Sequence, residues 1–139
     1  MEALKMSDLS LTLPFFDINN PVGFPAPATD GQEQGIDLSR VLQPHPASSF
    51  VIRVKGDSMA EASIPDGCMA VVDRSLRPST GDIIVAELNG EYVVRRLVKA
   101  GRNWVLHAEN TFYKPVLITE DTDFQVWGVV VSVIVDMRK

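Results

Sequence analysis

Six short runs rich in apolar and β-branched residues follow one another from Ile36 onward, and turn-forming residues separate them. They occupy residues 48–54, 68–73, 81–88, 91–98, 103–108 and 124–135. Runs of this length, bounded by Gly, Pro, Asn, Asp and Ser, are typical of β-strands. The pattern predicts an all-β fold, with a single compact domain of short, mostly antiparallel strands.

The dipeptide Asn89-Gly90 stands between two of these runs. A two-residue type I′ turn needs a positive φ at both central positions, which Asn and Gly tolerate best. We therefore expect a tight hairpin there. Residues 37–43 are predicted to form a single helical turn capped by Asp37.

Residues 1–36 show no sustained helical or alternating period and are interrupted by Pro, Asn and Gly. Pro21, Pro25 and Pro27 favour an extended backbone around residues 22–28. The sequence therefore predicts two parts: an extended N-terminal arm over residues 1–36 and a β-rich domain over residues 37–139.

The chain has 139 residues, a formal net charge of -5 and a pI near 4.9. Proteins bind duplex DNA mainly by neutralising phosphates with cationic side chains, so direct duplex binding is not expected. Cys68 is the single cysteine, which fits a reducing compartment. The apolar run within residues 1–16 is too short for a signal peptide or a membrane span. We expect a cytoplasmic protein.

Ser58 follows Gly56-Asp57 at the end of a predicted strand and precedes residues that favour helix. The unpaired backbone N–H groups of a helix start, at Ser58 and Met59, would form an oxyanion region if this serine attacked a carbonyl. The same spacing is also a capping box, in which the Ser58 hydroxyl accepts from the N–H of Glu61. On spacing alone, a serine in this pattern is more often a helix cap than a nucleophile.

A nucleophilic serine needs a base within hydrogen-bond reach. His45 lies between two prolines and His107 lies in a predicted strand, and neither has neighbours that mark it as a base. No His, Cys or carboxylate cluster has metal-ligand spacing, and no glycine-rich loop precedes a helix. We therefore expect neither a metal nor a nucleotide cofactor.

Several stretches together resemble the LexA/UmuD-type family of self-cleaving serine–lysine proteases, in its UmuD-type branch. They are GFPAPATD at 23–30, IDLSRVL at 36–42, HPASSFVIRVKGDSM at 45–59, IPDGCMAVVDRS at 64–75, GDIIVAELNGEYVVRRL at 81–97 and VWGVVVSVIV at 126–135. The resemblance runs in order from about residue 22 to the end of the chain.

The resemblance implies a homodimeric subunit of the SOS DNA-damage response. In this family, a RecA filament on single-stranded DNA stimulates cleavage of the arm, and the shortened form joins a UmuC-type translesion polymerase. By position, Ser58 matches the nucleophile and the bond Val22-Gly23 matches the scissile bond. LexA repressors add a helix-turn-helix, for which this arm is too short and irregular, so repressor activity is disfavoured.

The family's general base is a lysine in the strand motif E-[FY]-x-V-K-[KR]-L, and Arg95 stands at that position here. Burial can make a lysine neutral, whereas a guanidinium stays protonated in proteins. We therefore expect Arg95 to donate to Ser58 without deprotonating it, so that self-cleavage is impaired. Lys99 lies about 13 Å further along the strand, and Lys55 is expected to point to solvent.

Two alternatives remain open at this stage. The chain could be a non-catalytic dimeric interaction module in which Ser58 only caps a helix and the arm is a strap laid across the partner. A relative of the signal peptidases, which also use Ser and Lys, is a weaker alternative because no membrane anchor is evident.

Overall fold

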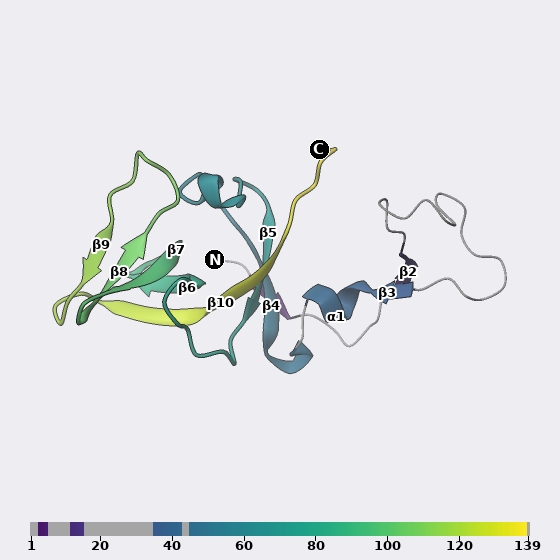
Figure 1. Cartoon of the computed structure of the whole chain (residues 1–139), viewed down its shortest axis with the longest axis horizontal. Coiled ribbons are helices and arrows are strands. Elements are labelled where there is room, and N and C mark those ends of the chain that lie inside the picture. Colours follow the sequence, from purple (N-terminus) through teal and green to yellow (C-terminus); the bar gives the residue numbers. More distant parts are fainter. Residues whose placement is uncertain (1–2, 6–11, 16–34, 43–44, 139) are drawn as a thin grey trace.

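The backbone is organised around one antiparallel sheet of eight strands (Figure 1). The structure is a computed structural model, and it describes residues 3–5, 12–15, 35–42 and 45–138. The strands follow the order β1-β4-β5-β10-β6-β7-β8-β9 across the sheet. Their bounds are β1 Ala3–Lys5, β4 Ser49–Arg53, β5 Met69–Asp73, β6 Ile83–Leu88, β7 Glu91–Ala100, β8 Asn103–His107, β9 Val116–Ile118 and β10 Phe124–Ile134. The all-β, antiparallel fold predicted from the sequence is confirmed, and all six predicted runs contain a strand.

The long strand β10 joins the two halves of the sheet (Figure 1). Its first half pairs with β6 and its second half pairs with β5. The register shifts between Val126 and Gly128, and again between Val130 and Ser132. Such irregularities bend a strand and increase its twist. A Cβ atom at Gly128 would lie 2.5 Å from Val72 Cγ1, so only glycine lets β5 pass this closely.

The hairpin between β6 and β7 turns at Asn89 and Gly90, as predicted. Their φ angles are 50° and 86°, and Leu88 pairs directly with Glu91. Both central residues therefore have the positive φ that a two-residue type I′ turn requires. This hairpin places β7, the strand that carries Arg95, beside β6.

Shorter elements lie in the N-terminal part of the chain. The helix α1 (Leu38–Leu42) begins after Asp37, whose Oδ1 accepts from the N–H of Ser39 at 3.1 Å, so the predicted capped turn is confirmed. A two-stranded pair is formed by β2 (Thr12–Pro14) and β3 (Gly35–Asp37). Among the described residues, no helix has the length and apolar character needed to cross a bilayer.

Four strands of three residues, β1, β2, β3 and β9, were not predicted from the sequence. Three residues are too few to show an alternating period, and such strands form only where a neighbour offers a free edge. Residues 16–34, most of the expected arm, lie outside the described part of the chain. The boundary between arm and domain therefore stays a prediction.

Strand β6 contributes to two hydrophobic clusters, one on each face of the sheet. Val85 joins a cluster with residues of β4, β5 and the following turns, including Ile52, Met59 and Ile64. The alternate residues Ile84 and Ala86 join a second cluster with Leu97, Leu106 and Val129. Successive side chains of a strand point to opposite faces, so one strand supports both clusters. This rigid strand lies directly beside β7.

Candidate active site at Ser58 and Arg95

Ser58 lies in a turn that follows β4. Gly56 has a φ of 92°, and its N–H donates to the Asp66 carboxylate at 2.7 Å. The N–H of Ala60 donates to the carbonyl of Asp57 at 3.1 Å, which closes the turn around Ser58. The left-handed glycine redirects the chain out of the strand. The hydroxyl of Ser58 is half-buried as a result.

The helix predicted after Ser58 is a single 3₁₀ turn, η2 (Ala60–Ala62), and Ser58 does not cap it. The N–H of Glu61, which a capping Ser58 would bind, donates instead to the carbonyl of Glu109 at 2.8 Å. The capping-box interpretation is therefore wrong. Within the described part of the chain, the N–H groups of Ser58 and Met59 have no protein acceptor.

Arg95 reaches Ser58 from β7. Its Nη1 donates to Ser58 Oγ at 2.7 Å and to the carbonyl of Val94 at 2.8 Å. The guanidinium carbon lies 5.6 Å from the centroid of the Tyr113 ring. Arg95 is paired with Ile84 in the sheet, and this register fixes the position of Arg95 relative to β6. The contact joins two residues that are 37 positions apart in the chain.

The chemical state of this pair follows from its surroundings. Burial lowers the pKa of Arg95 below its usual value, while the neighbouring Tyr113 raises it. A guanidinium in a protein nevertheless keeps its proton and has no lone pair to offer. Arg95 therefore acts as a hydrogen-bond donor to the Ser58 hydroxyl.

A cleft of about 920 Å³ opens in front of this pair. One rim is the stretch 52–56 at the end of β4, and the other is the stretch 90–95 at the start of β7. The pairing of β7 with β8 begins only at Arg96, so along residues 91–95 one edge of β7 pairs with no other described strand. The cleft thus has room for an extended segment beside an edge of β7 that no described strand occupies.

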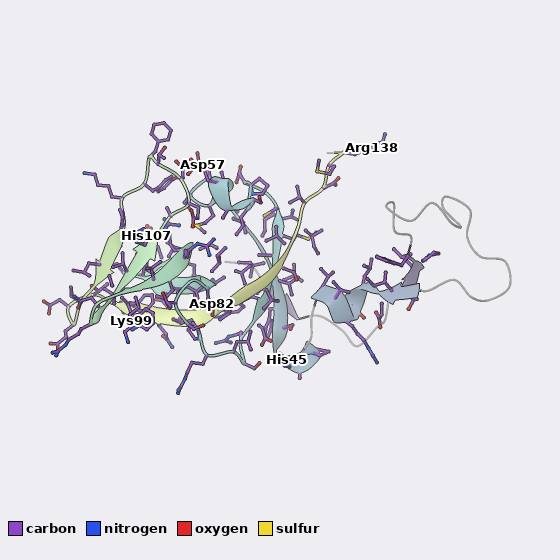
Figure 2. The ribbon with its side chains drawn as sticks, in the orientation of Figure 1. His45, Asp57, Asp82, Lys99, His107 and Arg138 are labelled. Atoms are coloured by element: carbon purple, nitrogen blue, oxygen red, sulfur yellow. The ribbon has the colours of Figure 1, made fainter. Side chains whose placement is uncertain are left out.

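The other lysines and histidines considered in the sequence do not take the place of a base at Ser58 in the described structure. Lys99 places its Nζ 5.6 Å from the Trp104 ring, and Figure 2 shows it far from Asp57, the neighbour of Ser58. Lys55 lines the cleft with an exposed side chain. His45 lies at the opposite end of the domain from Asp57 in Figure 2. None of these four residues, His107 included, has a hydrogen bond to Ser58 in the described part of the chain.

Two residues of the loop between β8 and β9 belong to the site and were not singled out in the sequence. Asn110 Nδ2 donates to the carbonyl of Asp57 at 2.8 Å, and the Tyr113 hydroxyl donates to the Asp57 carboxylate at 2.8 Å. The hydrogen bond to Asp57 is the largest of the effects that raise the pKa of Tyr113. No local pattern marks these residues, because both contacts span more than fifty positions of sequence.

The predicted scissile bond, Val22-Gly23, lies outside the described residues. Over the ranges that the structure describes, no three His, Cys, Asp or Glu side chains are grouped so that they could hold a metal ion.

Comparison of the sequence with known proteins shows the family of the chain. The family model for Peptidase S24-like proteins matches residues 14–131, and the chain belongs to that family. Protein SamA of Salmonella typhimurium is 38% identical over 132 residues, which cover 95% of this chain and 91% of SamA.

Two further relatives show the same likeness. Protein MucA of Escherichia coli is 32% identical over 125 residues, covering 90% of this chain and 86% of MucA. Protein ImpA of Escherichia coli is 43% identical over 91 residues, covering 66% of this chain and 63% of ImpA. These relatives are UmuD-like proteins, so the resemblance drawn from the sequence motifs is confirmed.

Proposed function

We propose that the chain is a UmuD-like subunit of an error-prone translesion DNA polymerase in the SOS response, with self-cleavage impaired by Arg95. The observation that carries the proposal is the 2.7 Å hydrogen bond from Arg95 Nη1 to Ser58 Oγ. It supports the proposal because a general base would have to lie within hydrogen-bond reach of this oxygen, and a guanidinium there is a permanent donor.

The proton balance explains the impairment. When Ser58 Oγ attacks a carbonyl carbon, the hydroxyl proton must pass to a base as the new C–O bond forms. A neutral lysine amine at position 95 would accept that proton and later give it to the leaving amine. The guanidinium accepts no proton, and its hydrogen bond occupies a lone pair of the attacking oxygen.

The remaining features of the site suit peptide hydrolysis. The N–H groups of Ser58 and Met59, without protein acceptors in the described ranges, are candidates to stabilise the oxyanion. We propose that the arm lies in the 920 Å³ cleft as an extended strand along residues 91–95, with Val22-Gly23 opposite Ser58. Glycine after the bond leaves the backbone open to attack.

The partners follow from the same assignment. The proposed partners are a second copy of the chain, a UmuC-type polymerase and a RecA filament on single-stranded DNA. The net charge of -5 favours protein contacts over direct contact with duplex DNA. The arm, retained because cleavage is impaired, would stay available to these contacts.

The test is restoration of the base by Arg95→Lys. We expect the unchanged chain to stay intact at alkaline pH, and the Lys variant to release a fragment that begins at Gly23. A positioned general base contributes about 10²–10⁴-fold to a rate, so the increase should be at least about 100-fold. Intact mass spectrometry over time measures it, without and then with RecA, ATP and single-stranded DNA.

Two control variants make the result specific. Arg95→Lys combined with Ser58→Ala should not cleave, since it lacks the nucleophile. Arg95→Gln keeps a hydrogen-bond donor but provides no amine, and it should also stay intact. Cleavage of the unchanged chain as fast as the Lys variant would overturn the role given to Arg95. A folded Lys variant that stays intact would show that position 95 is not the base position.

A further inference from the structure

The turn that carries Ser58 is held from outside by the loop between β8 and β9. Three residues of that loop, Glu109, Asn110 and Tyr113, make the contacts, and we call them the clamp residues. The carbonyl of Glu109 accepts from Glu61 at 2.8 Å, Asn110 donates to the Asp57 carbonyl, and Tyr113 donates to the Asp57 carboxylate. The hydrogen bonds therefore grip the turn on both sides of Ser58.

The clamp residues are themselves tied to β7. Glu109 Oε1 accepts from Arg96 Nε at 2.5 Å, and Arg96 Nη1 donates to the carbonyl of Gly81 at 2.6 Å. Arg96 is the immediate neighbour of Arg95 on the strand. Hydrogen bonds therefore connect β7 to the clamp residues and the clamp residues to the turn. The bond between Ser58 and Arg95 connects the turn back to β7.

The loop has internal hydrogen bonds that define its shape. Asn110 Oδ1 accepts from the N–H of Phe112 at 3.0 Å, and the carbonyl of Asn110 accepts from the N–H of Tyr113 at 3.1 Å. The Asn110 side chain therefore joins the loop to the turn. Its Oδ1 accepts a hydrogen bond within the loop, and its Nδ2 donates to the turn. By contrast, the Phe112 side chain is 92% exposed at the tip of the loop.

No strand pairing joins the turn of Ser58 to β7 in the described structure. The distance between the nucleophile and position 95 then depends on contacts other than strand pairing. A misplacement of about 1 Å in a catalytic pair can cost about 100-fold in rate. The clamp residues supply three such contacts to the turn.

We propose that Asn110 and Tyr113 are positioning residues, which hold Asp57 and so set Ser58 against the side chain at position 95. The proposal rests on the proposed function, because the quantity that they set is the geometry of a cleavage reaction. Neither residue reacts with the peptide. Asn110 fixes the backbone of the turn, and Tyr113 fixes the Asp57 carboxylate.

The test uses the Arg95→Lys chain, which is expected to cleave. Adding Asn110→Ala should lower the maximal self-cleavage rate about 10–100-fold without moving its pH profile, because the turn shifts while the charges stay the same. Adding Tyr113→Phe removes the hydroxyl that holds the Asp57 carboxylate, and it should also lower the maximal rate about 10–100-fold. A general loss of structure would also speed hydrogen exchange of the β6 amides, which Asn110→Ala should leave unaffected.

Phe112→Ala is the matched control, since its side chain lies in the same loop and is almost fully exposed. In the Arg95→Lys background it should leave the rate of spontaneous alkaline cleavage unchanged. Loss of rate in this control equal to that in Asn110→Ala would overturn the proposal. A Tyr113→Phe rate equal to that of the Arg95→Lys chain would overturn the role given to Tyr113.

A second measurement separates this proposal from the proposed function. In the unchanged Arg95 chain, the Glu61 amide is bonded to the Glu109 carbonyl, so hydrogen exchange reports directly on the turn. Asn110→Ala should speed exchange of that amide and leave amides of β6 unaffected. Faster exchange together with an uncleaved Lys variant would support the clamp and refute the proposed function. If the Lys variant cleaves but Asn110→Ala changes neither the cleavage rate nor the exchange of the Glu61 amide, the clamp alone is refuted.

Discussion

The burial and hydrogen bonds of Asp73 predict how the stability of the folded domain depends on pH. Its side chain is 1% exposed, at the end of β5. Oδ1 accepts from Ser48 Oγ at 2.8 Å, and from the N–H and hydroxyl of Ser75 at 2.8 and 2.7 Å. Oδ2 lies 2.6 Å from His45 Nδ1. A buried carboxylate with this many donors is stabilised in its charged form.

The pKa of Asp73 reflects two opposing effects. Burial raises it, but the hydrogen bonds from Ser75, His45 and Ser48 outweigh burial and lower the pKa from 3.8 to about 2. Because the pKa in the folded state is below that of the unfolded chain, the carboxylate contributes stability above pH 3.8 that is lost as the pH falls through 2. The difference of about 1.8 pH units corresponds to about 2 kcal/mol.

Urea denaturation of the unchanged chain and of Asp73→Asn, at several pH values between 7 and 2, tests this prediction. The difference in unfolding free energy between the two chains should shrink by about 2 kcal/mol as the pH falls from 5 to 2. Asp121→Asn, an exposed site in the turn before β10, controls for the general effect of removing a carboxylate. A difference between Asp73→Asn and the unchanged chain that stays constant over this range would refute the reasoning.

Two substitutions test the packing that supports the site, both by chemical denaturation. Gly128→Ala should destabilise the domain by about 1–3 kcal/mol, because the new methyl group would meet Val72 Cγ1 and the Asp73 carbonyl; an unchanged midpoint would contradict the close approach of β5 and β10. Leu106→Ala should cost about 2–5 kcal/mol, since Leu106 is fully buried. Leu117→Ala, on a side chain that is 50% exposed, should cost much less, and equal losses at the two positions would contradict the assigned core.

Much of the sheet was predictable because its signals are local. The residues of β4 to β8 and β10 alternate or run together over five or more positions, and the turn at Asn89-Gly90 depends on the φ preferences of those two residues alone. The strands β1, β2, β3 and β9 were missed because each is three residues long and depends on the edge that a neighbour provides. The local pattern around Ser58 was misleading, since it suggested a capped helix where the structure has a 3₁₀ turn held by Glu109.

The sequence alone determined the class of fold, the hairpin that carries Arg95, and, through its motifs, the family and the pairing of Ser58 with position 95. These depend on backbone preferences and residue identities, which are present in the chain before it folds. Only the tertiary structure decided the geometry of the contact between Ser58 and Arg95 and which groups hold the turn of Ser58. Those contacts join residues between 37 and 56 positions apart, and only packing of the sheet and its loops brings such groups within hydrogen-bond distance.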